Sequence, residues 1–515
     1  MGRKNILAGM FFGMTLLFAA GCGKDADAEK GSANVTGTAQ TDGAEPNEGQ
    51  KKDGTGQMED GADVGKEDSE IGSGEGGKEN GQQNPEDATP EPTQVGIPPV
   101  PTLTPAATVT PEISGGTDED TRTQEEIYQD MIERSLLSAG NNYRVKKVLE
   151  KARNGENVLL GYIGGSITEG ANASDATCYV TKSYDGFVEL TGTKDKGNVS
   201  FVNAGLGGTS SALGIMRYDR DIVELSGKLP DIVFIEFSVN DWQEPTKGEA
   251  FESLIRKVYS AENEPAVVLV FAVFQSRWNM QSDYTPLGKL YGLPMISILD
   301  AVVPALDVEH TLDEDLFFSD IYHPTQYGHG IMADCIQYMF EQLDAAAADE
   351  PYTMPEKSWY GDTYEHVVMI DAARQDAVTE LSPGSFSEND KTLGSYRYGE
   401  KPKTFPDNWM HGTDGGEEAF EMKLTCKGLL MAYKQSSDKK FGSVDVYVDG
   451  EFVMKVDGYS DGGWNNPVPV QIIKGREEAE HTVEIRMSEG SKEKAFSILA
   501  FAAGMEEEAA DGGKE

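Results

Sequence analysis

Apolar residues in the middle of the chain gather into short, nearly continuous runs. Strands that are covered on both faces need apolar residues at successive positions, whereas half-exposed strands alternate. Patterns with helical spacing fall between the runs, at Ala212 to Gly227 and at Glu249 to Ala261. This alternation predicts an α/β domain with a parallel sheet between two layers of helices. The apolar runs lie at 157–164, 199–205, 231–237, 266–274 and 294–300.

Helical patterns also flank this region. Thr123 and Glu126 have the spacing of a capping box, and apolar positions then recur at helical spacing up to a stop at Asn154-Gly155. A last helix is predicted to open at Pro324, whose fixed φ suits a first helical turn. We therefore expect this domain to span residues 123–350.

Beyond Glu350 the apolar period changes to two. Val444, Val446 and Val448 fall on one face, and Asp449-Gly450 supplies a hairpin turn after them. These features predict an all-β sandwich, jelly-roll-like, over residues 351–508, followed by a disordered tail at 509–515. Further strand-like runs lie at 421–434, 467–474, 481–487 and 496–503.

The N-terminal quarter has a different character. Basic residues precede an apolar run from Ile6 to Ala20, which ends in small residues before Cys22 and is too short to span a membrane. Residues 1–22 resemble a bacterial lipoprotein signal, which implies lipidation of Cys22; an ordinary cleaved signal with an incidental cysteine is the alternative. Residues 23–122 contain no aromatic residue and are acidic and Pro/Thr-rich towards their end, which predicts a disordered tether. We expect an exported protein that a lipid anchor holds on the outer face of the cell membrane.

Charge and cysteine content exclude several classes of partner. The formal net charge is −44, so no basic patch is available to displace counterions, and nucleic acid is not expected as a partner. Cys178, Cys335 and Cys426 are isolated and lack the paired spacing of a zinc site. No metal or organic cofactor is expected.

Polar and glycine residues follow the first three predicted strands. Ser166 follows the first, a glycine turn at 205–210 follows the second, and Asn240 follows the third. Because the carboxyl ends of parallel strands meet at one edge of the sheet, these groups should converge. A hydroxyl, backbone N–H groups and a side-chain amide are the parts that acyl transfer requires.

A general base is found near the end of the domain. His323 has Asp320 three residues before it, close enough for the carboxylate to accept the Nδ1 proton and leave Nε2 facing a serine. His329 lies near enough to be an alternative base. The glycine turn also invites a dinucleotide-binding interpretation, but Ser210 replaces the next glycine of that fingerprint.

Four motifs follow one another along the chain: "GGSIT", "NAGLGGTS", "SVND" and "DIYHP". This is the order of the four sequence blocks of the SGNH hydrolases, also called GDSL esterases, and the chain resembles that family. The resemblance implies a three-layer αβα, flavodoxin-like fold with Ser166 as nucleophile. It also implies Asp320 as the orienting acid and His323 as the general base. Gly165 stands where the family has an aspartate, and Ser238 where it has a glycine, so we expect an altered pocket but the same reaction.

The same resemblance identifies the oxyanion hole. Its donors would be the backbone N–H groups of Ser166 and Gly208 and the side-chain amide of Asn240. Gly205 and Gly207 are the alternatives to Gly208 within the same turn.

The predicted activity is that of a serine esterase which hydrolyses small acyl esters. The chain has no long apolar lid segment, which favours small acyl groups. Its layout of export signal plus β-sandwich resembles bacterial carbohydrate esterases that remove acetyl groups, so the acyl group is expected to be acetyl. The expected substrate is therefore an acylated carbohydrate or another small ester at the cell surface. An O-acyltransferase that acts on cell-surface glycan with the same triad, and a non-catalytic glycan-binding lipoprotein, are the alternatives. The oligomeric state is not predicted.

Several aromatic residues are candidates for contact with a sugar, although each has a structural role as its alternative. In the sheet domain they are Trp242, Trp278 and Tyr291; in the sandwich they are Trp409 and Trp464.

Overall fold

The computed structural model describes residues 121–393, 404–475 and 477–507. The predicted signal, Cys22, nearly all of the tether and the C-terminal tail lie outside the described residues. Within these ranges, no helix is both long and apolar enough to cross a membrane. The described residues belong to one compact unit, which contains the sheet domain and the sandwich.

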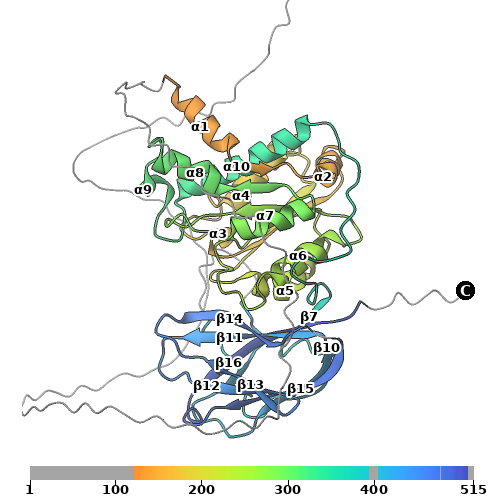
Figure 1. The fold of residues 1–515 in the computed structure, drawn as a ribbon, viewed down its shortest axis with the longest axis vertical. Helices are drawn as coiled ribbons and strands as arrows, with labels where there is room; N and C mark the ends of the chain where they lie inside the picture. Colours follow the sequence, from red (N-terminus) through yellow and green to blue (C-terminus); the bar gives the residue numbers. More distant parts are fainter. Residues whose placement is uncertain (1–120, 394–403, 476, 508–515) are drawn as a thin grey trace, which may run out of the picture. The chain divides into compact units, whose positions relative to one another are not determined.

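A six-stranded sheet forms the centre of the first domain (Figure 1). The spatial order is β1-β6-β5-β4-β2-β3, and all neighbours are parallel except the edge strand β1. Without β1, this is the 2-1-3-4-5 order of flavodoxin-like sheets, so the predicted fold class is confirmed. Every residue of β2, β4 and β5 is buried, which explains their unbroken apolar runs. The strands are β1 (Leu136–Ser138), β2 (Val158–Gly164), β3 (Val199–Gly205), β4 (Ile232–Glu236), β5 (Ala266–Phe271) and β6 (Met295–Ser297).

Helices cover both faces of this sheet, and each face has its own apolar core. One face is covered by α1 (Gln124–Glu133), α2 (Tyr143–Arg153), α4 (Tyr179–Leu190), α8 (Ile298–Asp307) and α10 (Gln326–Ala345). The other is covered by α5 (Ser211–Tyr218), the π-helix η1 (Asp219–Glu224), α6 (Glu249–Tyr259) and α7 (Gln281–Leu290). Two four-residue helices, α3 (Ser166–Glu169) and α9 (Glu314–Phe317), belong to the loops at the carboxyl edge of the sheet.

At the start of the domain, the predicted beginning of the first helix is confirmed, but the predicted helical pattern after it is not continuous. The capping box of Thr123 and Glu126 is present at the start of α1. The helical pattern that follows is interrupted, however, because the chain leaves the helix at Arg134 and adds β1 to the edge of the sheet, where Leu136 pairs with Ile296.

Two more boundaries differ from the prediction near the end of the domain. The strand predicted to reach 300 stops at Ser297, because the Ser297 hydroxyl accepts the N–H of Asp300 and so caps α8. Pro324 lies before the last helix and forms a bridge with Phe318, while Thr325 is the residue that caps α10.

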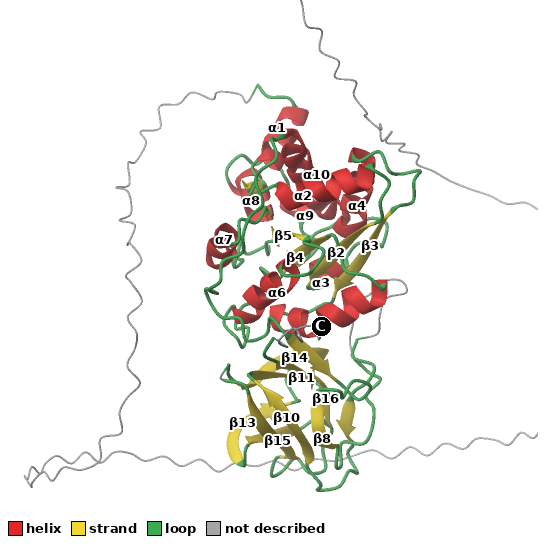
Figure 2. Cartoon of the chain, turned by 90° about the vertical axis from the view of Figure 1, so that its right-hand side faces the viewer, coloured by secondary structure: helices red, strands yellow, loops and turns green. Residues whose placement is uncertain are grey.

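The second domain is a sandwich of two antiparallel sheets, which confirms the predicted architecture (Figure 2). One sheet has the order β13-β12-β15-β10-β8, and the other has the order β14-β11-β16-β7 with β9 also paired to β16. The predicted hairpin is present, with positive φ at Asp449 and Gly450. The strands are β7 (Val367–Ile370), β8 (Val378–Ser382), β9 (Trp409–His411), β10 (Phe420–Cys426), β11 (Gly428–Ser436), β12 (Ser443–Val448), β13 (Glu451–Asp457), β14 (Trp464–Ile473), β15 (Ala479–Met487) and β16 (Phe496–Gly504).

Candidate active site

Ser166 lies at the switch point of the sheet, which falls between the neighbouring strands β2 and β4: the chain continues from β2 to β3 on one side and from β4 to β5 on the other. β2 ends at Gly164, and Ser166 is the first residue of α3, so its backbone N–H has no acceptor within the helix. The turn is tight: a Cβ at Gly164 would lie 2.1 Å from the Thr168 hydroxyl and 2.5 Å from the Glu236 carbonyl oxygen. The glycine therefore allows the serine to follow the strand directly.

His323 contacts Ser166 from the loop between α9 and α10. Its Nε2 lies 2.9 Å from the Ser166 Oγ, and its Nδ1 lies 3.0 Å from each carboxylate oxygen of Asp320. The three side chains thus form one hydrogen-bonded series, which the tertiary structure assembles across 157 residues of sequence between serine and histidine. Both Ser166 and His323 are buried, with 9% and 8% of their surfaces exposed.

The carboxylate of Asp320 is held in place by several donors. Its Oδ1 accepts the N–H groups of Tyr322 and His323 at 2.8 and 2.9 Å, and its Oδ2 accepts the Asn172 amide at 2.9 Å. Burial alone would raise the pKa of Asp320, but the hydrogen bonds from His323 and Tyr322 outweigh it and lower the pKa below its usual range. Asp320 is therefore ionised when it faces the imidazole. Asn172 was not predicted, because its segment contacts Asp320 only in the folded chain.

His329, the alternative base, is committed to a structural role. It is fully buried on α10, where its Nε2 contacts the carbonyl oxygen of Ala171 at 3.0 Å and its Nδ1 accepts the N–H of Tyr179 at 3.3 Å. Burial lowers the pKa of His329 to about 4, so the ring is neutral at pH 7. Neither ring nitrogen is available to Ser166.

The glycine turn after β3 distinguishes the three candidate oxyanion donors. The N–H of Gly205 bonds Asn203 at 2.8 Å, and the N–H of Gly207 bonds the buried carboxylate of Glu169 at 2.6 Å. Within the described residues, the N–H of Gly208 has no such partner, and its φ of +68° is one that glycine favours. Gly208 is thus the one of the three whose N–H group is left for a ligand.

Asn240 follows β4 and packs against the backbone before Ser166. A Cβ at Gly165 would lie 2.2 Å from the Asn240 Oδ1 and 2.9 Å from its Nδ2. The missing side chain at position 165 is therefore what allows the amide to approach the serine turn. Ser238, the second departure from the family pattern, donates its hydroxyl to the Ala272 carbonyl oxygen at 3.1 Å and so ties the loops after β4 and β5 together.

Two buried acidic residues lie beneath the loops that follow β2, β3 and β4. Glu236, the last residue of β4, accepts the Thr168 hydroxyl at 2.9 Å, and burial raises the pKa of Glu236 to about 8. Asp241 accepts the N–H of Ser211 and the hydroxyl of Tyr284, each at 2.7 Å, and burial raises the pKa of Asp241 to about 7. These side chains connect the site to α5 and α7.

The predicted aromatic contacts divide into surface and core residues. Trp242 is 71% exposed, and its ring centroid lies 6.1 Å from that of Trp278. Tyr291 is fully buried and donates its hydroxyl to Glu252, so the suggestion that it forms a sugar-stacking wall is wrong. Trp409 packs in the sandwich core against Phe420 and Phe501. Trp242 and Trp278 stay candidates for contact with a sugar.

Trp464 of the sandwich contacts the sheet domain. A Cβ at Gly208 would lie 2.7 Å from the indole Cζ2 of Trp464. The second domain therefore packs against the glycine turn that carries a candidate oxyanion donor.

Comparison with known proteins agrees with this geometry. Residues 162–331 match the GDSL-like Lipase/Acylhydrolase family. Two solved structures of a two-domain esterase (CEX) active on acetylated mannans, one of them co-crystallized with mannopentaose, match at 24% and 25% identity. Each match covers 73% of this chain and 99% of the esterase, with a TM-score of 0.62. A search of curated protein sequences finds no significant match.

Proposed function

We propose, from the premise that residues 162–331 form a GDSL-type acylhydrolase domain, that this carboxylic ester hydrolase removes acetyl groups from carbohydrate at the cell surface. The observation that carries the proposal is the hydrogen-bonded series of Ser166, His323 and Asp320 at the carboxyl edge of the sheet. The similarity to an esterase active on acetylated mannans supports a carbohydrate substrate.

The roles of the residues follow from their positions. Ser166 attacks the ester carbonyl while His323 Nε2 takes the hydroxyl proton, and Asp320 stabilises the imidazolium that forms. His323 then gives this proton to the sugar oxygen as its bond to the acetyl carbon breaks; the sugar departs with a free hydroxyl group, and an acetyl-serine remains. Water, deprotonated by the same imidazole, hydrolyses this intermediate to acetate and regenerates the serine.

Negative charge develops on the carbonyl oxygen during both steps. The backbone N–H groups of Ser166 and Gly208 and the amide of Asn240 are the donors we assign to it. Preorganised donors stabilise this charge without the reorganisation that water would require. The chemistry as proposed uses only these side chains and backbone groups.

The test is the variant Ser166→Ala, assayed on p-nitrophenyl acetate and by acetate release from acetylated manno-oligosaccharides. We expect turnover to be abolished on both substrates, because no other group on the proposed pathway can form the acyl-enzyme. Ser276→Ala changes an exposed serine in the loop after β5 and serves as the control. Activity near wild type in Ser166→Ala would refute the assignment.

The location at the cell surface rests on the predicted lipoprotein signal. Metabolic labelling with palmitate should mark the wild-type protein, and Cys22→Ser should lose the label and leave the membrane fraction. A Cys22→Ser protein that stays labelled and sediments with membranes would contradict lipidation at that residue.

A further inference from the structure

A continuous row of aromatic rings leads away from His323. The ring of Tyr322 lies 6.1 Å from His323 and 5.2 Å from Phe274, measured between centroids. Phe274 lies 6.0 Å from Trp278, which in turn lies 6.1 Å from Trp242. We call Tyr322, Phe274, Trp278 and Trp242 the aromatic row. Its rings come from the loops after β4 and β5 and from the loop that carries the general base.

The two ends of the row are exposed. Tyr322 is 50% exposed and Trp242 is 71% exposed, so neither ring is needed to fill the core. Exposed aromatic faces beside a catalytic group are suited to contact the apolar faces of sugar rings.

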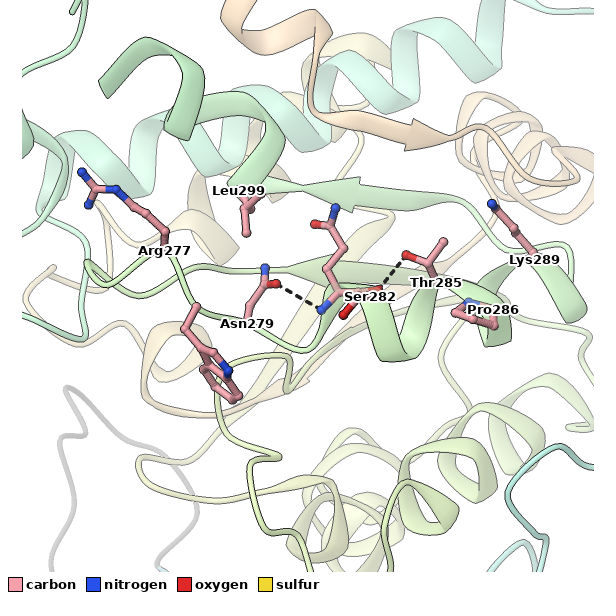
Figure 3. Close-up of a pocket in the computed structure, with 9 residues that line it drawn as sticks. Arg277, Asn279, Ser282, Thr285, Pro286, Lys289 and Leu299 are labelled. Carbon is pink, nitrogen blue, oxygen red and sulfur yellow. Dashed lines mark hydrogen bonds between the residues drawn. The ribbon is translucent and has the colours of Figure 1, made fainter. Parts of the chain in front are cut away.

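Trp278 also lines a groove. The groove runs along α7 (Figure 3). It has a volume of about 660 Å³ and is polar at Asn279, Ser282 and Thr285, with Pro286 and Leu299 as apolar contacts. Figure 3 shows Arg277 at one end and Lys289 at the other. We call this the α7 groove.

The side chains that line the groove are mostly uncharged, with Arg277 and Lys289 as the charged exceptions. Arg277 is paired with Asp307 at 2.7 Å and with Glu314 at 2.8 Å, so its positive charge is neutralised locally. The chain as a whole carries −44. An uncharged ligand with many hydroxyl groups fits the mostly uncharged lining, and the negative net charge of the chain disfavours a long polyanion.

We propose that the aromatic row and the α7 groove form an extended binding site for an uncharged glycan chain, several sugar residues long, whose acylated residue lies at Ser166. This inference rests on the proposed function and adds the length and charge class of the substrate. Sugar rings stack on Tyr322, Trp278 and Trp242, while Asn279 and Ser282 bond hydroxyl groups further along the chain.

The experiment compares acetylated manno-oligosaccharides of increasing length with p-nitrophenyl acetate. For the wild type, kcat/KM should rise with glycan length and then reach a plateau. In Trp242→Ala and Trp278→Ala, the ratio of kcat/KM on the longest glycan to that on p-nitrophenyl acetate should fall about 10-fold, the size expected for loss of an aromatic contact. Trp359→Ala removes another exposed tryptophan, from the segment before the sandwich and outside the row and the groove, and should leave that ratio as it is.

A second variant tests the groove without removing Trp278, whose loss could also alter the local packing. Ser282→Trp adds bulk at an exposed position of the groove, and it should produce the same length-dependent loss. Glycan hydrolysis that is independent of length, with both tryptophan variants like the wild type, would overturn the extended site but leave the proposed function intact. A wild-type enzyme that cleaves p-nitrophenyl acetate but no acetylated glycan would refute the proposed function itself. Equal length enhancement on acetylated polygalacturonate would overturn the uncharged class.

Discussion

At the scale of single residues, the Asn240 side chain packs closely against the backbone of Gly165 in the site. The Asn240 Oδ1 is buried and has no hydrogen-bond partner among the described residues, so packing holds the amide in place. A Cβ at position 165 would meet only the end of this side chain, which can rotate away at little cost in stability. The rotation would, however, move the amide from the oxyanion.

We therefore expect Gly165→Ala to lower kcat on p-nitrophenyl acetate by roughly 10-fold or more while the melting temperature changes little. Steady-state kinetics and thermal unfolding measure the two effects. A variant that loses stability but keeps its kcat would show that Gly165 serves the turn and not the amide.

Asn240→Ala removes the amide itself. If the Nδ2 group stabilises the oxyanion, kcat should fall by about 10²-fold with a small change in KM. In the double variant with Gly165→Ala, the second substitution should add little, because both act on one group. Additive losses in this double-mutant cycle would contradict the coupling.

Glu236 makes stability depend on pH. Burial raises the pKa of Glu236 to about 8, whereas the unfolded chain ionises this carboxyl near its ordinary pKa of about 4.3. Between these values the folded chain holds a proton that the unfolded chain has lost, so the free energy of unfolding falls as pH rises. Glu236→Gln does not titrate, and its free energy of unfolding should fall less between about pH 5 and pH 8 in urea titrations. An equal fall in both proteins would place the titrating group elsewhere, with Asp241 the next to test.

At the scale of elements, a side chain of α5 is hydrogen-bonded to the ends of β2 and β3, the two strands that precede the serine turn and the glycine turn. Arg217 on α5 is fully buried. It donates to the carbonyl oxygen of Gly164, the last residue of β2, and to that of Ala204, the next-to-last residue of β3. It also pairs with the buried Asp221 at 3.2 Å. One guanidinium group thus sets the relative position of two catalytic loops.

Arg217→Met should lower the free energy of unfolding by about 1–3 kcal/mol, because it removes a buried donor from Asp221 and from the Ala204 carbonyl oxygen, although Asp221 keeps its ion pair with Arg220. Chemical denaturation measures the loss. Arg153→Met, which breaks the more exposed pair with Asp344, is the control and should have a much smaller effect. A midpoint for Arg217→Met equal to that of the control would contradict this role.

At the scale of the whole molecule, the sandwich and the sheet domain share an apolar core. Met369, Leu430 and Leu499 of the sandwich belong to the same cluster of buried side chains as residues of α5 and α6. The ion pair of Arg256 with Glu365, 2.7 Å long, is also buried. Because the apolar surfaces of both domains are covered by each other, we expect one cooperative unfolding transition for the two domains.

Glu365→Ala tests this coupling. The variant leaves Arg256 buried without its carboxylate, and we expect a loss of about 3–5 kcal/mol that lowers one common transition in calorimetry. Glu417→Ala breaks an exposed ion pair with Lys492 and should not move the transition measurably. Two separate transitions, with only the sandwich affected, would show that the domains unfold independently.

The sequence by itself determined the five parallel strands of the central sheet and the order of the motifs. Buried parallel strands require unbroken apolar runs, and the loops after them were recognisable because Ser166, Asn240 and the Asp320 and His323 pair lie in short local patterns. Hairpin chemistry at Asp449-Gly450 was equally local.

Only the tertiary structure decided how these groups are held. Asn172, Glu169 and Arg217 act on segments remote in sequence, so no local pattern revealed them. The choice of Gly208 over Gly207 depended on the carboxylate of Glu169, which occupies the Gly207 N–H. Strand and helix types follow from neighbouring residues, whereas hydrogen-bond partners across the sheet edge exist only once the chain has folded.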